Sequence, residues 1–128
     1  MELRGPATRP NRPLLVTFHD SGTATASSSS GTESAHAGIW VRVGDRKFLQ
    51  TMYVFVCNEQ RVLAAINKVR ITAQLDDRGT TIHGPAEIVV MDALGHVTTI
   101  RGVEYTGVRL IVERSADAED FLRDESGN

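Results

Sequence analysis

Strand-like runs separated by short turn signals occupy most of this sequence. Seven runs rich in Val, Ile, Thr and aromatic residues alternate with breaks such as DSG, GD and DDRG. This composition is typical of β-strands joined by hairpin turns. A crossover between parallel strands needs about a dozen residues, which these breaks do not offer. The chain is therefore expected to form an all-β, antiparallel, up-and-down meander.

The runs divide the chain into three segments. Residues 1–13 hold three of the four prolines and are expected to form an extended or disordered lead. Residues 14–114 are expected to form a β-barrel domain. Residues 115–128 form a C-terminal segment, in which ADAEDFLRD predicts a short helix. Phe121 and Leu122 are its only apolar anchors, so this helix either caps a barrel end or frays.

The clearest alternation of apolar and polar residues lies at residues 63–75. Val69 and Ile71 are in phase with its other apolar side chains and Arg70 is out of phase, which predicts one buried and one solvated face. The run at residues 46–58 is apolar on both parities and should be covered on both sides. We expect one face of this run to line a lumen. The other face is expected to contact the C-terminal segment or a partner subunit, which would make a homodimer.

A closed barrel and a two-sheet sandwich are the two architectures open to such strands. Greek-key sandwiches need long connections between their sheets. The only long irregular link in this chain is the Ser- and Gly-rich SSSSGTES. The long meander therefore favours an up-and-down barrel of seven or eight strands.

Charge and composition exclude several classes of partner. Sixteen acidic against fourteen basic residues leave a net charge of -2, which offers no basic field for nucleic acid. No apolar stretch approaches the about 18 residues of a membrane-spanning helix. The N-terminal MELRGPATRPNRP carries charge and proline where a signal peptide needs an apolar core. Cys57 is the only cysteine and cannot form an internal disulfide, so a cytoplasmic location is expected.

Three motifs carry a resemblance to a known group of proteins. HAGIWVRVGDRKFLQTMYVFVCN, LDDRGTTIHGPAEIVVMD and VEYTGVRL follow one another in this order. They resemble the HGxW strand with its aromatic-rich partner, the DpDGdtftG hairpin and the terminal GTGTVTGTRI strand of small bacterial calycin-like or lipocalin-like β-barrel proteins. The resemblance spans roughly Leu14 to Val112, and it departs where Ala37 separates His36 from Gly38. It implies a barrel whose apolar lumen takes a small molecule, although many members of the group have no assigned activity.

Motifs of strong independent specificity are absent from the sequence. There is no P-loop, no G-x-G-x-x-G, no H-E-x-x-H and no G-x-S-x-G. The four histidines are spread about one per strand and lack the short spacing of a metal-binding pair, so neither a metal nor a cofactor is expected. These residues are His19, His36, His83 and His96.

Trp40 and Tyr53 are the candidates for a ligand-contacting wall. Trp40 shares a strand face with Gly38 and His36, and it is either a core plug or part of the wall. The resemblance implies that Trp40 pairs with Arg109 through a cation–π contact. Tyr53 shares its parity with Phe55, and its hydroxyl needs a partner in an apolar wall. That hydroxyl either orients a ligand or acts as a general acid, or it simply bonds to the backbone.

Three further polar residues lie within apolar runs. Asn67 is the one amide on the otherwise apolar parity of residues 63–75, and a buried amide is costly unless ligand, water or protein meets its hydrogen bonds. Glu104 and Tyr105 lie in the middle of the last run. An inward Glu104 would have its pKa raised by desolvation toward that of a general acid or base, whereas an outward Glu104 would pair with a neighbouring cation. Both parities of this run hold apolar residues, so both orientations stay open.

Three functions follow from these residues. The first is the binding of a small apolar or aromatic molecule in the lumen. The second is a cofactor-free isomerase, cyclase or lyase, in which Tyr53, Asn67 and Glu104 supply the catalytic groups. The third is a structural or interaction role as a homodimer. The residues expected to contact the ligand are Trp40, Phe55, His36 and Tyr105.

Overall fold

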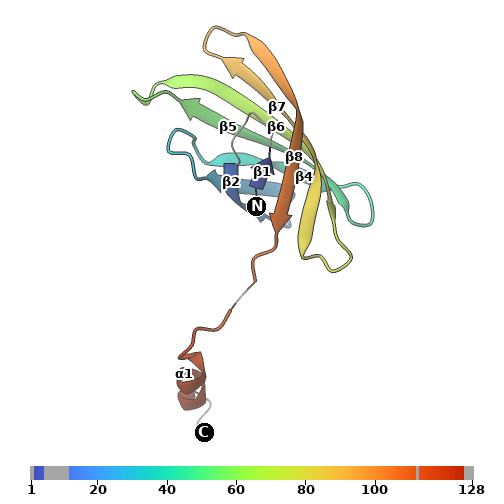
Figure 1. Cartoon of the computed structure of the whole chain (residues 1–128), viewed down its shortest axis with the longest axis vertical. Coiled ribbons are helices and arrows are strands. Elements are labelled where there is room, and N and C mark those ends of the chain that lie inside the picture. The colour runs from blue at the N-terminus through green and yellow to red at the C-terminus, as the bar shows by residue number, and fades with distance from the viewer. Residues whose placement is uncertain (1, 5–11, 112, 126–128) are drawn as a thin grey trace.

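The computed structural model describes residues 2–4, 12–111 and 113–125, which form eight strands and one helix (Figure 1). The strands are β1 (Glu2–Arg4), β2 (Arg12–Phe18), β3 (Thr23–Ser28), β4 (His36–Arg42), β5 (Lys47–Cys57), β6 (Leu63–Leu75), β7 (Thr81–Asp92) and β8 (Val97–Val108), and the helix is α1 (Ala118–Glu125). The seven predicted strands correspond to β2–β8, so the all-β prediction is confirmed. β1 was not expected, because the lead at residues 1–13 was predicted to be extended or disordered. The rest of that lead, apart from residues 12 and 13 in β2, lies outside the described residues.

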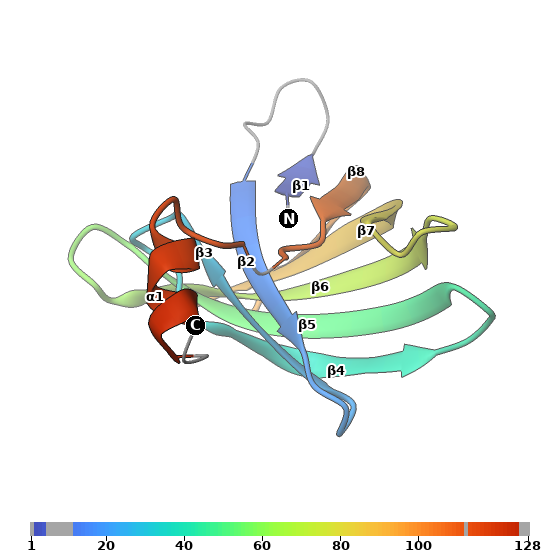
Figure 2. The same cartoon turned by 90° about the horizontal axis from the view of Figure 1, so that it is seen from below.

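Each strand pairs antiparallel with its neighbour in sequence, which confirms the up-and-down meander. The seven strands β2–β8 form a strongly curled half-barrel (Figure 2). β1 lies between β2 and β8, where Leu3 pairs with Arg12 on one side and with Tyr105 on the other. The ring of paired strands is completed only over this short stretch, and the barrel is open along the rest of the seam between β2 and β8.

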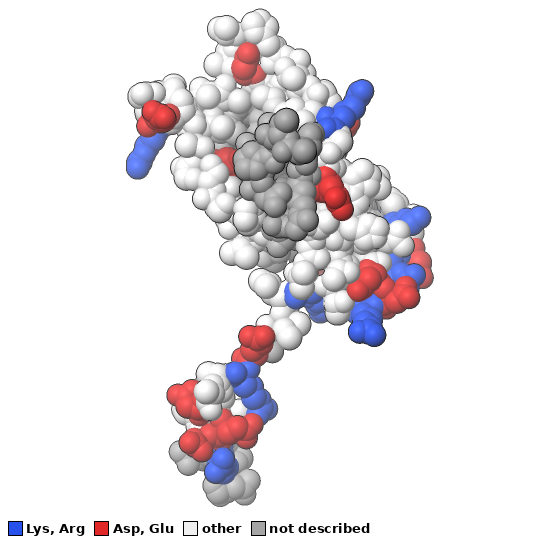
Figure 3. All heavy atoms as spheres, in the orientation of Figure 1, with Lys and Arg blue, Asp and Glu red and all other residues white. Residues whose placement is uncertain are grey.

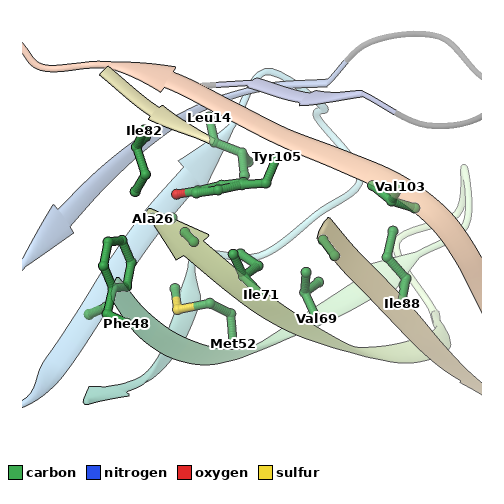
Figure 4. Close-up of a cluster of buried hydrophobic side chains, with 13 residues drawn as sticks. Leu14, Ala26, Phe48, Met52, Val69, Ile71, Ile82, Ile88, Val103 and Tyr105 are labelled. Carbon is green, nitrogen blue, oxygen red and sulfur yellow. The ribbon is translucent and has the colours of Figure 1, made fainter. Parts of the chain in front are cut away.

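The core lies on the concave face of the curled sheet, where buried apolar side chains of β2, β3 and β5–β8 meet (Figure 4). The alternation predicted for residues 63–75 is confirmed, because Val69, Ile71 and Ala73 are buried in β6 while Arg70 and Thr72 are exposed. The other large buried side chains of the core are Leu14, Phe48, Met52, Ile82, Ile88 and Tyr105.

Two glycines allow the sheet to coil this tightly. A Cβ atom at Gly38 would overlap the carbonyl oxygen of Thr51 on β5, and a Cβ at Gly84 would overlap the carbonyl oxygen of Thr72 on β6. At both positions the neighbouring strand crosses directly over the glycine. Only a residue without a side chain permits so close an approach of two backbones.

A β-bulge in β8 sets the orientation of the last strand. Ile88 pairs with Ile100 and Ala86 pairs with Val103, so two residues of β8 stand opposite one residue of β7. Gly102 occupies the extra position with a φ of 72°, a conformation that glycine adopts without strain. The bulge shifts the alternation by one residue. It explains why apolar residues occupy both parities of this run.

The C-terminal helix α1 confirms the predicted short helix. It lies away from the barrel at the end of an extended stretch of chain (Figure 1). Phe121 is 67% exposed and Leu122 is 42% exposed, so neither side chain caps the barrel. In Figure 3 the helix carries acidic and basic side chains close together, while much of the barrel face in this view is uncharged. None of the described residues belongs to a helix long and apolar enough to cross a membrane.

Candidate functional site

A cavity of about 570 Å³ opens where β2 meets the end of β8, and we call it the mouth cavity. Its volume lies within the range of small-molecule sites, which is about 300–1,000 Å³. Among the described residues that line it, three threonines and Arg109 supply the polar side chains, and Arg109 is the only charged one. Its apolar wall includes Val16, Phe18, Trp40, Phe48, Leu75 and Ile82.

Three aromatic rings from different strands form the wall of the mouth cavity next to the core. The centroid of the Phe18 ring lies 5.9 Å from that of Trp40 and 5.3 Å from that of Phe48, and the Trp40 and Phe48 centroids are 6.4 Å apart. All three pairs meet edge to face, an arrangement that aromatic quadrupoles favour. Trp40 Nε1 also donates a hydrogen bond to the carbonyl oxygen of His19 at 2.9 Å. Ring packing and this hydrogen bond together hold the indole in place.

Trp40 packs against the core and also lines the mouth cavity, so it lies at the boundary between the two. The contact with Arg109 implied by the resemblance is not formed. Both residues line the cavity, but the ring contacts of Trp40 in the described part of the chain are with Phe18 and Phe48.

The turn between β6 and β7 forms the rim of the mouth cavity through Gly79 and Thr80, together with Thr81 at the start of β7. The Asp76 carboxylate accepts a hydrogen bond from the Thr80 backbone N–H at 2.7 Å and another from the Thr80 hydroxyl at 2.8 Å. These bonds stabilise the charged carboxylate and hold the pKa of Asp76 well below its usual value. The backbone N–H of Arg109 donates to the carbonyl oxygen of Thr80 at 2.8 Å. This hydrogen bond holds Arg109, the first residue after β8, against the turn between β6 and β7.

A second cavity lies deeper in the barrel, and we call it the inner cavity. Its volume is about 10 Å³, close to the minimum that holds one water molecule. Val16 lines both cavities, so they are neighbours in the interior. The polar residues that line the inner cavity are His36, Gln50 and Tyr105.

His36 belongs to a buried polar pair. Its Nε2 lies 3.1 Å from Oε2 of Glu33, and each side chain is only 5% exposed. Glu33 lies before β4 and forms an isolated bridge with Val56 of β5, which brings it over the barrel interior. An imidazole N–H that donates to a carboxylate satisfies one acceptor of a group that is expensive to bury. Sequence reasoning found His36 but missed Glu33, because Glu33 lies in a polar segment without alternation.

Gln50 is the second buried polar residue that sequence reasoning missed. It is 2% exposed, and its Oε1 has no hydrogen-bond partner in the described structure. Asn67 presents the same situation on β6, since its buried Oδ1 also lacks a partner, but Asn67 lines neither the mouth nor the inner cavity. The signal for Gln50 was present in the sequence, because it is a lone amide on an apolar parity of its strand.

Tyr105 is completely buried in the core. Its ring crosses the interior near Leu14 and Ala26, with the hydroxyl directed toward the side where Ile82 and Phe48 lie (Figure 4). Burial disfavours the charged phenolate and raises the pKa of Tyr105. The side chain is therefore a neutral phenol over the physiological pH range.

This burial predicts an alkaline loss of stability that depends on Tyr105. In the unfolded chain a tyrosine releases its proton near pH 10, whereas the raised pKa keeps the proton on Tyr105 in the folded chain. The free energy of unfolding should therefore fall as pH rises above about 10, by up to about 1.4 kcal/mol per pH unit. Urea unfolding from pH about 9 to about 11 measures this slope, and Tyr105→Phe should show a shallower one. Parallel slopes for the two proteins would assign the effect to other groups.

The expectation that Tyr53 and Phe55 face the lumen is wrong. They are 51% and 53% exposed, on the convex face of β5, because the buried parity of that strand is the one that holds Phe48, Met52 and Val54. β5 is apolar on both faces, so its alternation did not distinguish inside from outside. Exposed apolar neighbours continue this outer surface, and they are Ile39, Val41 and Leu49. The homodimer through this face stays a prediction.

An inward Glu104 is also contradicted, because its side chain is exposed while Val103 and Tyr105 on either side are buried. The bulge at Gly102 turns Glu104 outward. The three expected catalytic residues therefore do not meet, since Tyr53 and Glu104 lie outside the barrel while Asn67 lies on its inner face. The structure brings together Trp40 at the mouth cavity and His36 with Tyr105 at the inner cavity.

Comparison with protein-family models, curated proteins and solved structures found no match for this chain. Within the described ranges there is also no group of three or more His, Cys, Asp or Glu side chains placed to hold a metal ion. The two adjoining cavities and the aromatic rings between them are the features from which a function can be inferred.

Proposed function

We propose that this protein binds a small apolar or aromatic molecule in the mouth cavity. The observation that carries the proposal is a cavity of about 570 Å³ whose wall combines aliphatic side chains with the edge-to-face cluster of Phe18, Trp40 and Phe48. Ligand sites of this size are typically apolar, with a few polar groups that orient the ligand. Thr80, Thr81 and the Arg109 side of the rim are suited to that second role.

The architecture supports the same proposal. Up-and-down barrels of about eight strands have an interior wide enough for one small ligand. The open seam between β2 and β8 leads into the mouth cavity, since residues from the ends of both strands line it. Together with the three sequence motifs, this arrangement supports a calycin-like or lipocalin-like binding protein.

A cofactor-free isomerase, cyclase or lyase stays a prediction. In such an enzyme the catalytic groups would differ from those expected from the sequence. The buried acid/base groups beside the inner cavity are Tyr105 and His36 with its Glu33 partner, whereas Tyr53 and Glu104 are exposed. If a folded His36→Gln variant kept the activity of the wild-type enzyme, His36 would not be a catalytic residue.

Binding can be tested through Trp40, the only tryptophan in the chain. Because the indole lines the mouth cavity, titration with the fluorescent aromatic amine N-phenyl-1-naphthylamine should quench its emission with a saturable curve. Trp40→Ala should weaken binding about tenfold or more, since it removes a large apolar contact and a stacking partner. The fluorescence of the probe itself measures the dissociation constant of that variant.

Tyr53→Ala is the matched control, because it truncates an aromatic side chain on the outer face. Its dissociation constant should equal that of the wild-type protein. Equal weakening by Tyr53→Ala and Trp40→Ala would place the ligand outside the barrel. A wild-type protein that fails to bind any member of a broad panel of small aromatic molecules would contradict the proposed function.

A further inference from the structure

Gln50, which lines the inner cavity, has a side-chain oxygen that accepts no hydrogen bond from the described residues. Gln50 is 2% exposed, and its Oε1 has no hydrogen-bond partner in the described structure. Folded proteins rarely leave a buried acceptor unpaired, because the group has lost its hydrogen bonds to water and gained nothing in return. A hydroxyl or N–H placed against Gln50 Oε1 would recover that loss.

The size of the inner cavity limits what that donor can be. About 10 Å³ admits a group of one heavy atom, such as a hydroxyl, an amino N–H or a water molecule. A carboxylate has too many atoms for this space and would present lone pairs to an acceptor. Most of the surrounding wall is apolar, formed by Leu14, Val16, Ala26, Met52, Val69 and Ile71.

The position of Gln50 connects this cavity to the mouth. Gln50 stands opposite Trp40 in the pairing of β4 with β5, and it lies two residues after Phe48 on the same face of β5. Trp40 and Phe48 both line the mouth cavity, and Val16 lines both cavities. The unpaired acceptor therefore lies one layer of side chains below the aromatic wall on which the ligand would rest.

We propose that the ligand of the mouth cavity carries a small hydrogen-bond donor, a hydroxyl or an N–H, which enters the inner cavity and donates to Gln50 Oε1. This inference rests on the proposed function and narrows its ligand to apolar or aromatic molecules with one small donor at the leading end. A site that depends on a buried polar group discriminates strongly against analogues that lack the matching group. Phenols, indoles and apolar alcohols or amines belong to this class.

Three probes of similar shape test the proposal on the whole 128-residue chain. 2-Naphthol carries the donor, naphthalene lacks it, and 2-methoxynaphthalene replaces it with an acceptor. The wild-type protein should bind 2-naphthol at least about tenfold more tightly than either of the others, because only 2-naphthol satisfies Gln50. Hydrophobicity alone predicts the opposite order for 2-naphthol and naphthalene, since the hydroxyl makes 2-naphthol more soluble in water.

Gln50→Met removes the acceptor while keeping a side chain of similar length. In this variant 2-naphthol should lose its advantage over naphthalene. Asn67→Leu is the matched control, because it also removes a buried amide with an unpaired oxygen but lines neither cavity. Asn67→Leu should keep the preference for 2-naphthol. Thermal unfolding verifies that each variant is folded, and Gln50→Leu serves as a second variant.

Each outcome separates the two proposals. Equal binding of 2-naphthol and naphthalene to the wild-type protein would overturn the donor inference and leave the proposed function standing. A preference for 2-naphthol that persists in Gln50→Met would also overturn it. If neither these probes nor any member of the broad aromatic panel binds, the proposed function fails together with the inference. A crystal structure of the 2-naphthol complex decides between ligand and water as the donor, and a water at Gln50 with the naphthol hydroxyl elsewhere would overturn the proposal.

Discussion

Gly38→Ala is expected to lower the free energy of unfolding by more than about 3 kcal/mol, so that the variant unfolds at low concentrations of urea. The new Cβ would overlap the carbonyl oxygen of Thr51 and would lie 2.8 Å from the Cα and Sδ of Met52. Two of these obstacles are backbone atoms of β5, so a change of side-chain rotamer cannot relieve the overlap. Relief requires β4 and β5 to separate, which breaks their hydrogen bonds and opens the core.

Gly84→Ala should behave in the same way, because its Cβ would overlap the carbonyl oxygen of Thr72 and lie 2.9 Å from the Cα of Ala73. Gly31→Ala is the matched control, since a Cβ there would meet no atom within 4 Å. That control should stay within about 0.5 kcal/mol of the wild-type protein, or gain slightly from the lower entropy of its unfolded chain. Urea unfolding followed by far-ultraviolet circular dichroism measures all three variants. A Gly38→Ala protein as stable as Gly31→Ala would contradict the close crossing of β4 and β5.

His36→Leu is expected to lower the free energy of unfolding by about 1–3 kcal/mol, the cost of removing one hydrogen-bond partner from a buried polar group. The substitution leaves the Glu33 carboxylate, whose side chain is 5% exposed, without the imidazole that lies 3.1 Å from it. The substitution removes one hydrogen-bond donor from the Glu33 carboxylate, which stays buried and keeps its penalty of desolvation.

A double-mutant cycle tests this explanation. Glu33→Met combined with His36→Leu should cost less stability than the sum of the two single substitutions, because each single substitution already removes the contact between the two side chains. The measurement is the free energy of urea unfolding for the wild type, both single variants and the double variant. Strictly additive effects would show that the two side chains do not stabilise each other in the folded protein.

The strands were predictable where local pattern was strong. β2–β8 combine β-branched and aromatic residues with turn signals at short intervals, and the short turns alone require antiparallel neighbours. β1 was missed because its three residues contain no alternation. Leu3 owes its strand conformation to pairing with Arg12 and Tyr105, and the second of these lies about a hundred residues away in sequence.

The site was less predictable because it depends on which face of each strand turns inward. β5 has apolar residues on both faces, so Tyr53 and Phe55 were assigned to the lumen while Gln50 on the opposite parity was overlooked. In β8 the bulge at Gly102 shifts the alternation, which places Tyr105 inside and Glu104 outside. Trp40 was identified because it is the only tryptophan and shares a strand face with Gly38.

By itself the sequence determined an all-β meander, its strand order and its antiparallel pairing, because alternation and turn chemistry act between residues close together in the chain. Only the tertiary structure decided which parity of β5 is buried, how Glu33 reaches His36, and where the two cavities lie. Those features arise from the curl of the sheet, the bulge in β8 and the crossings at Gly38 and Gly84. They depend on contacts between distant strands, and such contacts leave no periodic signal in the residues that make them.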